Sequence, residues 1–461
     1  MDSNAKICLL VCAFAMAREF RPVEPFIAEF LIGPDVGLTE KQVVQDILVI
    51  STYASLVLVI VVFLVTDLLR YKPIVIADGV AGIMTYVLLL GRPSLQMIQV
   101  EQMFFAFFYS SDSVLYTYMY VKIEDKTTYN QITGYVRAAV LSGKFLSGFS
   151  SQVFVTLHQA GTNSSKLPLV YMSIAGMSIA TLVSLLLPSA THTFYFHRKT
   201  EAEVLQPSQA PSYGTIDIFT VEAETLSHTM KTDQVSESSV STNDHTASKV
   251  IKYLWTDFKE SFGNERVVVW AFWWSVGGAG FNLVLYYSQL IWKEAIEQNY
   301  PNMESMNGVV DCVYTALSAV ASYKVGQLNV EWTKHSNALL AIGSMGLGAI
   351  VFLTSQLKNI YLLYVCHIIL TLTYHTMLTV AEFEIAKQIK ESCYGLVFGF
   401  IMFINLAVTT FWTVIIVEDT FFTFNIKRQF EFCAGYFLVI GVYYLMKNIQ
   451  TSSRRNVHFN S

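Results

Sequence analysis

The chain has 461 residues, of which 53% are hydrophobic and 14% are charged, and its mean hydropathy is +0.44. A soluble chain of this length cannot bury so much apolar surface around its cores, so part of the solvent of this protein must be lipid. The net charge of -5 is too small to indicate a nucleic-acid or acidic partner. The six cysteines have no paired spacing that would indicate a disulfide framework or a metal site.

Apolar runs of about 20 residues, the length that a helix needs to cross the hydrocarbon of a bilayer, recur along the sequence. The runs are continuous rather than alternating, which excludes a β-barrel pattern and predicts helices. The expected spans of the first half are Ile7 to Phe30, Ile47 to Thr66, Ile74 to Leu90, Met97 to Val121, Tyr135 to Leu157 and Leu167 to Leu187. Those of the second half are Val267 to Trp292, Met306 to Tyr323, Ser336 to Leu353, Ile360 to Val380, Tyr394 to Val417 and Phe430 to Met446. The sequence therefore predicts an all-α membrane protein with twelve transmembrane helices in two six-helix halves.

The Lys and Arg residues of the short loops give an orientation for these spans. If the amino terminus is cytoplasmic, most of these residues fall on the cytoplasmic side, where positive charge is favoured. Both termini are therefore expected in the cytoplasm. The sequon Asn163-Ser164-Ser165 then lies in an outward loop, where Asn163 is a candidate glycosylation site.

The chain divides into four expected parts. Residues 1–188 form the N-terminal bundle, 189–262 a cytoplasmic polar linker, 263–448 the C-terminal bundle and 449–461 a cytoplasmic tail. The linker is rich in Ser, Thr, Asp and Glu, a composition typical of segments without a packed core. Its helix-like part, Val250 to Phe262, either lies along the membrane surface or is a solvated approach to the seventh span.

Ionisable residues inside membrane spans are costly, so each is a candidate for function. In the first span, Arg21-Pro22-Val23-Glu24-Pro25 interrupts the helix with two prolines. Glu24 can reach Arg21 one turn back. Glu24 is therefore either a substrate ligand or part of an ion pair that stitches a broken helix.

The fourth span places Tyr109, Asp112, Tyr116 and Tyr120 at helical spacing, so they share one face. A carboxylate flanked by aromatic rings suits an organic cation, because the rings attract cations through their faces and the carboxylate supplies the opposite charge. A stripe of tyrosines alone would more often be packing. The Asp favours function.

The fifth span places Lys144 among the small residues Gly143, Ser147, Gly148 and Ser151, which allow close helix approach or leave room for a solute. A Lys in this setting needs a partner, and Asp112 on the neighbouring span is the obvious one. If the two do pair, the site loses its net negative charge and the argument for a cation weakens.

The tenth span carries His367, Thr371, Tyr374, His375 and Glu382 close to one face. Such a group can carry a proton or bind a polar substrate. His375 and Glu382 are the candidates for proton coupling. The alternative is that the histidines are only hydrogen-bonded to a neighbouring helix.

The sequence contains no Walker-type phosphate loop, no His-Glu-x-x-His pair and no nucleophile elbow. ATP-driven pumping and hydrolysis are therefore unsupported, and neither an enzyme activity nor a cofactor is expected. Energy would come from an ion or exchange gradient, with a site near the middle of the membrane exposed alternately to its two sides.

Several stretches of the sequence carry a resemblance to a known family. They are Arg21-Pro22-Val23-Glu24-Pro25-Phe26, Thr66-Asp67-Leu68-Leu69-Arg70-Tyr71-Lys72-Pro73, Gly134-Tyr135-Val136-Arg137, Trp273-Trp274 with Ala279-Gly280-Phe281-Asn282, and Gly395-Leu396-Val397-Phe398-Gly399. The chain resembles the reduced folate carrier family, which includes the folate carrier and the thiamine transporters. This resemblance implies the major facilitator architecture, two six-helix halves around a central cavity, and transport across the plasma membrane.

The resemblance also implies a substrate charge. The folate carrier has cationic side chains where this chain has Asp112, Thr371 and Thr409, whereas the thiamine transporters have acidic residues at the positions of Asp112 and Glu24. A thiamine-like cation is therefore favoured.

Three differences from the thiamine transporters argue against thiamine itself as the substrate. Ser51, Leu115 and Lys144 replace aromatic residues of that branch. The substrate is then a diverged vitamin-like solute, zwitterionic or neutral. A folate-type organic-anion carrier anchored by Lys144, and a non-transporting membrane receptor or scaffold, are the alternatives. Proton or anion counter-transport is expected for a carrier. The candidate substrate-binding residues are Glu24, Asp112, Tyr116, Lys144, Asn282, Tyr286 and Tyr374.

Overall fold

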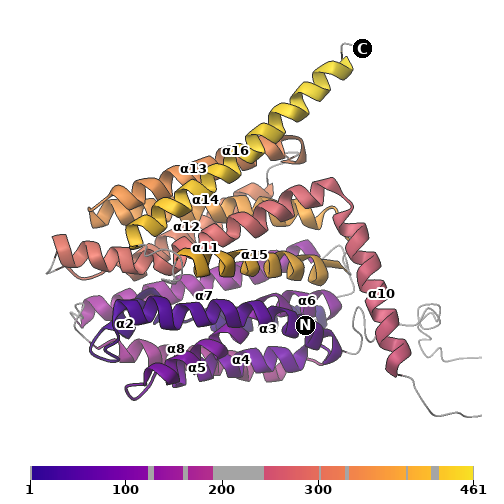
Figure 1. Ribbon diagram of the computed structural model, residues 1–461. Coiled ribbons are helices and arrows are strands. Elements are labelled where there is room, and N and C mark those ends of the chain that lie inside the picture. The colour runs from indigo at the N-terminus through magenta and orange to yellow at the C-terminus, as the bar shows by residue number, and fades with distance from the viewer. Residues whose placement is uncertain are drawn as a thin grey trace, which may run out of the picture.

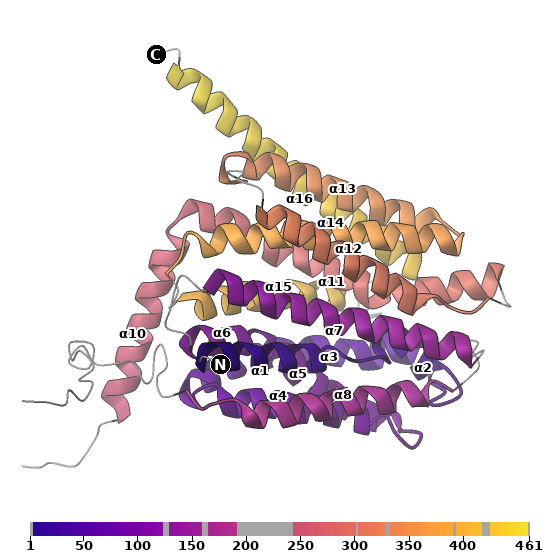
Figure 2. The same ribbon diagram turned by 180° about the vertical axis from the view of Figure 1, so that it is seen from behind.

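The computed structural model describes residues 3–122, 129–158, 165–190, 243–300, 303–327, 332–390, 393–416 and 425–459. Within these ranges every regular element is a helix, which confirms the all-α expectation. The helices lie side by side along one axis, with the N-terminal helices forming one layer of the molecule and most C-terminal helices the other (Figure 1). Figure 2 shows the same layering from behind.

The first half of the chain contains ten helical elements within the described residues. They are α1 (Ser3–Arg18), the 3-10 turn η1 (Glu24–Phe26), α2 (Ile27–Ile32), the π-helix η2 (Gln42–Ile47), α3 (Leu48–Leu68), α4 (Lys72–Val87), α5 (Leu95–Ser110), α6 (Asp112–Lys122), α7 (Tyr129–Leu157) and α8 (Leu167–Leu186). Two expected spans are interrupted. The first stops at Arg18, ahead of the two prolines, because proline cannot continue the hydrogen-bond ladder of a helix. The fourth breaks at Ser111, so the expected single helix is two.

The described residues of the second half contain the linker helix, six long helices and one 3-10 turn. They are α10 (Asn243–Phe262), α11 (Glu265–Asn299), α12 (Asn307–Gln327), the 3-10 turn η3 (Trp332–His335), α13 (Ser336–Gln356), α14 (Ile360–Ala386), α15 (Tyr394–Ile416) and α16 (Ile426–Phe459). Side chains cap two of them: Asn264 accepts a hydrogen bond from the backbone of Arg266, and Asn359 accepts from Tyr361 and Leu362.

Seven helical segments of the described chain are long and apolar enough to cross a membrane. They are Gln42–Thr66, Leu167–Leu186, Glu265–Asn299, Ser336–Gln356, Ile360–Ala386, Tyr394–Ile416 and Ile426–Ser453. All seven coincide with expected spans. The number of twelve transmembrane helices and the four domain boundaries stay predictions.

The linker helix α10 packs against the second half at one end of the bundle. Figure 1 shows it at a steep angle to the other helices, and its residues Phe258 and Phe262 meet the ring of Phe400 edge-on at 4.9 and 5.1 Å. Glu260 accepts a hydrogen bond of 2.6 Å from Lys390, which raises the pKa of Lys390 above its usual value. The expected helix is confirmed. Its position along the membrane surface stays a prediction, and residues 191–242 of the linker lie outside the described residues.

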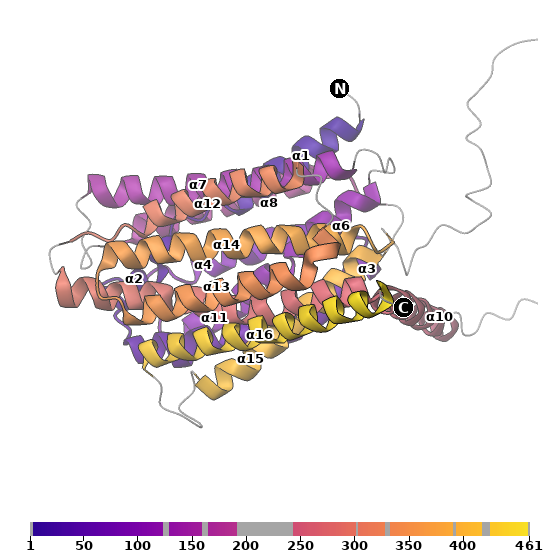
Figure 3. The same cartoon turned by 90° about the horizontal axis from the view of Figure 1, so that it is seen from above.

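The two halves meet along two helix pairs, α7 with α12 and α3 with α15. Figure 3 shows α7 alongside α12. A Cβ added to Gly308 would lie 2.6 Å from the carbonyl oxygen of Gly148, and one added to Gly148 would lie 2.9 Å from that of Gly308. These two glycines therefore allow the backbones of the halves to touch, as small residues do in membrane helices.

We predict that Gly308→Leu separates α7 from α12. Overpacking of this kind costs about 1–3 kcal/mol, so the thermal unfolding midpoint of the purified protein should fall. Gly346→Leu on α13 is the matched control, because a Cβ at Gly346 meets nothing within 4 Å. Equal midpoints for the two variants would contradict the close contact.

Candidate functional site

Arg18 ends α1 inside the N-terminal half and is surrounded by acceptors. Its Nε donates to Asp78 Oδ2 at 2.8 Å, and its Nη2 donates to Asp78 Oδ1 at 3.3 Å and to the backbone oxygen of Phe108 at 2.7 Å. Its Nη1 donates to Glu19 Oε1 at 2.9 Å and to Asp112 Oδ1 at 2.8 Å. A guanidinium has five N–H donors, and each of these five contacts uses one.

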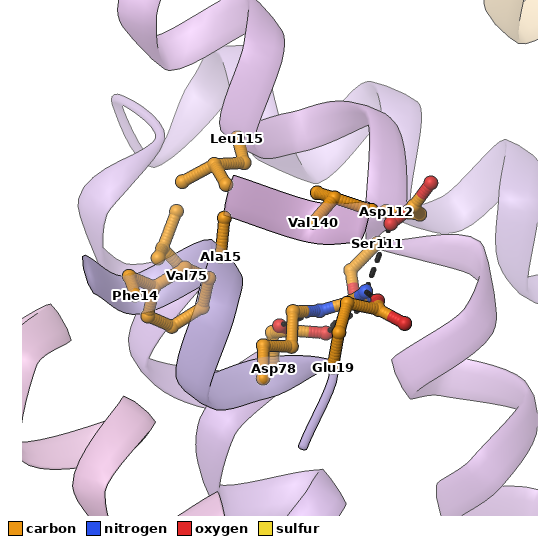
Figure 4. Close-up of a pocket in the computed structure, with 10 residues that line it drawn as sticks. Phe14, Ala15, Glu19, Val75, Asp78, Ser111, Asp112, Leu115 and Val140 are labelled. Atoms are coloured by element: carbon orange, nitrogen blue, oxygen red, sulfur yellow. Dashed lines mark hydrogen bonds and ion pairs between the residues drawn. The ribbon is translucent and has the colours of Figure 1, made fainter. Parts of the chain in front are cut away.

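A small pocket lies beside this guanidinium (Figure 4). Glu19, Asp78, Ser111 and Asp112 gather on one side of it, while Phe14, Val75 and Leu115 lie on the other. The Ser111 hydroxyl donates to Asp78 Oδ1 at 2.5 Å, so the break between α5 and α6 supplies a ligand for the buried carboxylate. The pocket has room for about one water molecule, and it is too small for an organic solute.

A second group of charges continues from Glu19 towards the opposite half. Arg21 Nη2 donates to Glu19 Oε2 at 2.8 Å, and Lys144 Nζ lies 3.9 Å from the same oxygen. Arg21 Nη1 lies 3.7 Å from Glu24 Oε1, which also accepts a hydrogen bond of 2.6 Å from the Tyr86 hydroxyl. The expected Arg21–Glu24 pair is confirmed.

The expected Lys144–Asp112 pair is wrong. Asp112 accepts from Arg18, and Lys144 forms an ion pair with Glu19. The physical reason is that α1 brings the Arg18 guanidinium within hydrogen-bond distance of Asp112 at the α5–α6 break. Lys144 lies on α7, which packs against α1 from another side.

Exposure divides the charged residues of this region into two groups. Side-chain exposure is 59% for Asp112, 41% for Lys144 and 30% for Glu24, against 4% for Asp78 and 5% for Glu19. The three exposed residues lie on α6, α7 and η1, and each of these elements contacts the other half of the protein through α15 or α12. All three are candidates that the sequence singled out.

The candidates of the second half also come together. Asn282 donates to Asn405 Oδ1 at 3.0 Å, and the ring of Tyr374 stacks on Phe281 with 3.8 Å between centroids. Tyr109 of α5 lies within hydrogen-bond reach of the candidate Asn282 and within electrostatic range of the candidates Tyr286 and Tyr374. Polar and aromatic groups from both halves therefore face each other here.

The residues of the tenth span have mainly aromatic neighbours. His375 stacks on Tyr314 at 6.4 Å and meets Phe281 edge-on at 5.7 Å. His367 meets Trp292 edge-on at 4.8 Å. Proton coupling through His375 stays a prediction.

Glu382 has a different setting, because it joins the two halves. Its Oε2 accepts a hydrogen bond from Arg137 Nη1 of α7, and Arg137 Nη2 also donates to Thr379 at 3.2 Å. The pair bridges α7 of the first half and α14 of the second. The proposed proton-coupling role of Glu382 is untested, and the geometry adds a role in holding the halves together.

Sequence reasoning missed four charged residues of this region. Arg18, Glu19 and Asp78 form the buried part of the cluster, and Asp311 of α12 lies near Lys144, Arg21 and Glu24. The signal was present, because each is an ionisable residue within or beside an apolar stretch. Two other candidates cannot be placed: the Tyr116 side chain and Asn163 lie outside the described residues.

Comparison with known proteins assigns the chain to a family. The sequence model of the family described as "Reduced folate carrier" matches residues 2–432 of this chain. The chain belongs to the reduced folate carrier family. Human thiamine transporter 2 is 30% identical over 97% of this chain and 92% of its own length. Human reduced folate transporter is 26% identical over 95% of this chain and 71% of its own length. The family consists of membrane transporters, so the expectation that the chain is no enzyme is confirmed.

A solved structure supports the fold. The crystal structure of the nucleoside transporter NupG matches with a TM-score of 0.58 and 10% identity, over 97% of this chain and 99% of that chain. At this identity the likeness concerns the fold alone. It confirms the expected major facilitator-type bundle.

We predict that the Arg137–Glu382 bridge couples the two halves. Arg137→Gln and Glu382→Gln should each slow transport, and their effects on the free energy of unfolding should deviate from additivity by about 0.5–3 kcal/mol, as contacting residues do. The measurement is a double-mutant cycle by thermal unfolding. Glu265→Gln is the control, because the pair of Glu265 with Lys447 lies within the second half. Additive effects would show that the bridge carries no coupling.

Proposed function

We propose that the chain is a secondary transporter of a small vitamin-like heterocycle, with a thiamine-like organic cation as the favoured substrate. The observation that carries this proposal is Asp112, an acidic side chain at a helix break in an expected membrane span that keeps 59% of its surface exposed. Arg18 holds this carboxylate through a single hydrogen bond to Oδ1. The carboxylate is therefore accessible to a substrate cation.

The charge balance of the N-terminal cluster supports a positively charged substrate. Its cationic members are Arg18, Arg21 and Lys144, and its acidic members are Glu19, Glu24, Asp78 and Asp112. Four carboxylates stand against these three cations, and Asp311 of α12 adds a fifth carboxylate near Lys144, so the region is net negative. Tyr109 lies within electrostatic range of Tyr286 and Tyr374 of the other half, and aromatic faces add attraction for a cation.

One observation favours a second candidate, a folate-type carrier of organic anions. The side chain of Lys144 is 41% exposed, and its ammonium group lies 3.9 Å from its acidic neighbour Glu19. This is a looser contact than those of Arg18. An anionic substrate would use Lys144 as its anchor.

Transport by alternating access requires contacts that open in turn at the two ends of the bundle. At the end next to α10, Arg137 and Glu382 join the halves. At the other end, Lys293 of α11 donates to Glu40 at 2.8 Å, and Asn307 of α12 donates to Glu29 at 3.2 Å. We propose that these contacts are the two gates, and that substrate lies between them.

The cellular setting completes the proposal. We place the protein in the plasma membrane with both termini in the cytoplasm, supported by the Lys and Arg distribution and by the family. A glycan on Asn163 fits this orientation. Counter-transport of a proton, with His375 and Glu382 as carriers, or of an anion would supply the energy.

Asp112→Asn is predicted to weaken saturable thiamine uptake in cells or proteoliposomes. The change removes the exposed negative charge while keeping the size of the side chain, and it should raise the half-saturating concentration about tenfold or more, a change of about 1.4 kcal/mol per factor of ten. Asp46→Asn, at an exposed position of η2, should leave uptake unchanged. If the Asp112→Asn variant takes up thiamine as the wild type does, the assignment of a cationic substrate is wrong.

Lys144→Ala distinguishes the two candidates. For a cation carrier, loss of this positive charge should leave thiamine uptake intact or strengthen it, because a charge that repels the cationic substrate is removed. For a folate-type carrier, the same change should abolish uptake of labelled reduced folate. Thermal shift with each vitamin measures binding independently of transport.

A further inference from the structure

Arg18 has two kinds of acidic partner. Asp78 receives two of its N–H groups, at 2.8 and 3.3 Å, and is 4% exposed. Asp112 receives one N–H group at 2.8 Å and is 59% exposed. A paired carboxylate that only stabilises the bundle would be expected to be buried like Asp78. Asp112 instead lies at the edge of the buried cluster, with most of its side chain exposed.

The guanidinium stays anchored if Asp112 leaves it. Asp78, the Glu19 carboxylate and the Phe108 carbonyl keep four of its five donors occupied. The carbon of the guanidinium also lies 4.0 Å from the centre of the Phe108 ring, which holds its plane. The contact with Asp112 is therefore the one that can be exchanged while Arg18 keeps its position.

We infer that Arg18 is a specificity-determining residue, a tethered cation that occupies Asp112 in the absence of substrate and that a substrate cation displaces. This inference rests on the proposed function. Arg18 and the substrate compete for one carboxylate, so Arg18 lowers the affinity of the site for any cation. A cation displaces it only by bringing further contacts. Tyr109, which lies within hydrogen-bond reach of Asn282, and the stacked pair Phe281 and Tyr374 offer such contacts to a flat ring. The chemical class is therefore an organic cation with an aromatic ring, and a simple inorganic cation is rejected.

The test is the double variant Arg18→Gln/Asp78→Asn. It removes one positive and one negative charge, so the net charge of the cluster is unchanged and Asp78 is not left as a buried carboxylate without its partner. Asp112 then has no tethered competitor. The concentration of labelled thiamine that gives half-maximal uptake should fall about tenfold, because competition for the site is removed. A purely structural role for Arg18 predicts the opposite, a weaker site.

Two further variants make the outcome specific. Adding Asp112→Asn to the double variant should cancel the gain in affinity, because the gain acts through that carboxylate. Arg18→Lys keeps the positive charge and loses the planar fork, so its half-saturating concentration should lie between those of the wild type and the double variant. If the double variant fails to fold, the half-saturating concentration of Arg18→Lys tests the inference. A half-saturating concentration equal to or above that of the wild type overturns it.

The results also separate this inference from the proposed function. Saturable thiamine uptake by the wild type, together with an unchanged or raised half-saturating concentration in a folded double variant, overturns the role of Arg18 alone. Loss of uptake in that folded variant means that Arg18 contacts the substrate directly, which also overturns it. If thiamine neither enters nor shifts the unfolding temperature of the wild type or any variant, the proposed function fails and this inference with it.

Discussion

The structure of the N-terminal half depends on a buried guanidinium and the carboxylates around it. Transfer of a lone charge from water to an apolar environment costs far more than one hydrogen bond returns, so such a charge persists only with partners. Arg18 meets this requirement by donating to acceptors from four places in the chain: the end of α1, α4, α5 and the start of α6. One side chain therefore fixes the relative positions of these helices.

The two irregularities of the backbone are what make this cluster possible. Proline residues end the regular helix after Arg18, and the turn at Ser111 separates α5 from α6. The Phe108 carbonyl can then accept from Arg18, and the Ser111 hydroxyl can donate to Asp78. Regular helices in lipid satisfy their own backbone groups. Breaks place polar groups inside the membrane, and here the side chains satisfy one another.

The apolar pattern predicted most of the helices, because a span needs only length and hydrophobicity. It did not predict the break at Ser111, where no proline or glycine marks the interruption. It identified Asp112, Lys144 and Glu24 as important but paired Asp112 with the wrong cation. Pairing depends on the three-dimensional approach of helices, and no periodicity encodes the distance from Arg18 to Asp112. The prediction considered only neighbouring spans, whereas α1 lies next to α6 despite 94 residues of separation.

Exposure, rather than the presence of charge, distinguishes the residues that we propose to act on a solute. The buried carboxylates Glu19 and Asp78 are paired with Arg18 and Arg21, so their removal would mainly affect folding. The exposed members, Asp112, Lys144 and Glu24, face the opposite half and have incomplete partnerships. Since the interaction between charges strengthens as water is excluded, closure of the two halves around a solute increases the weight of these three groups. On the proposed function, the sum of these three charges, together with the Arg18 that pairs with Asp112, governs which solute the closed state accepts.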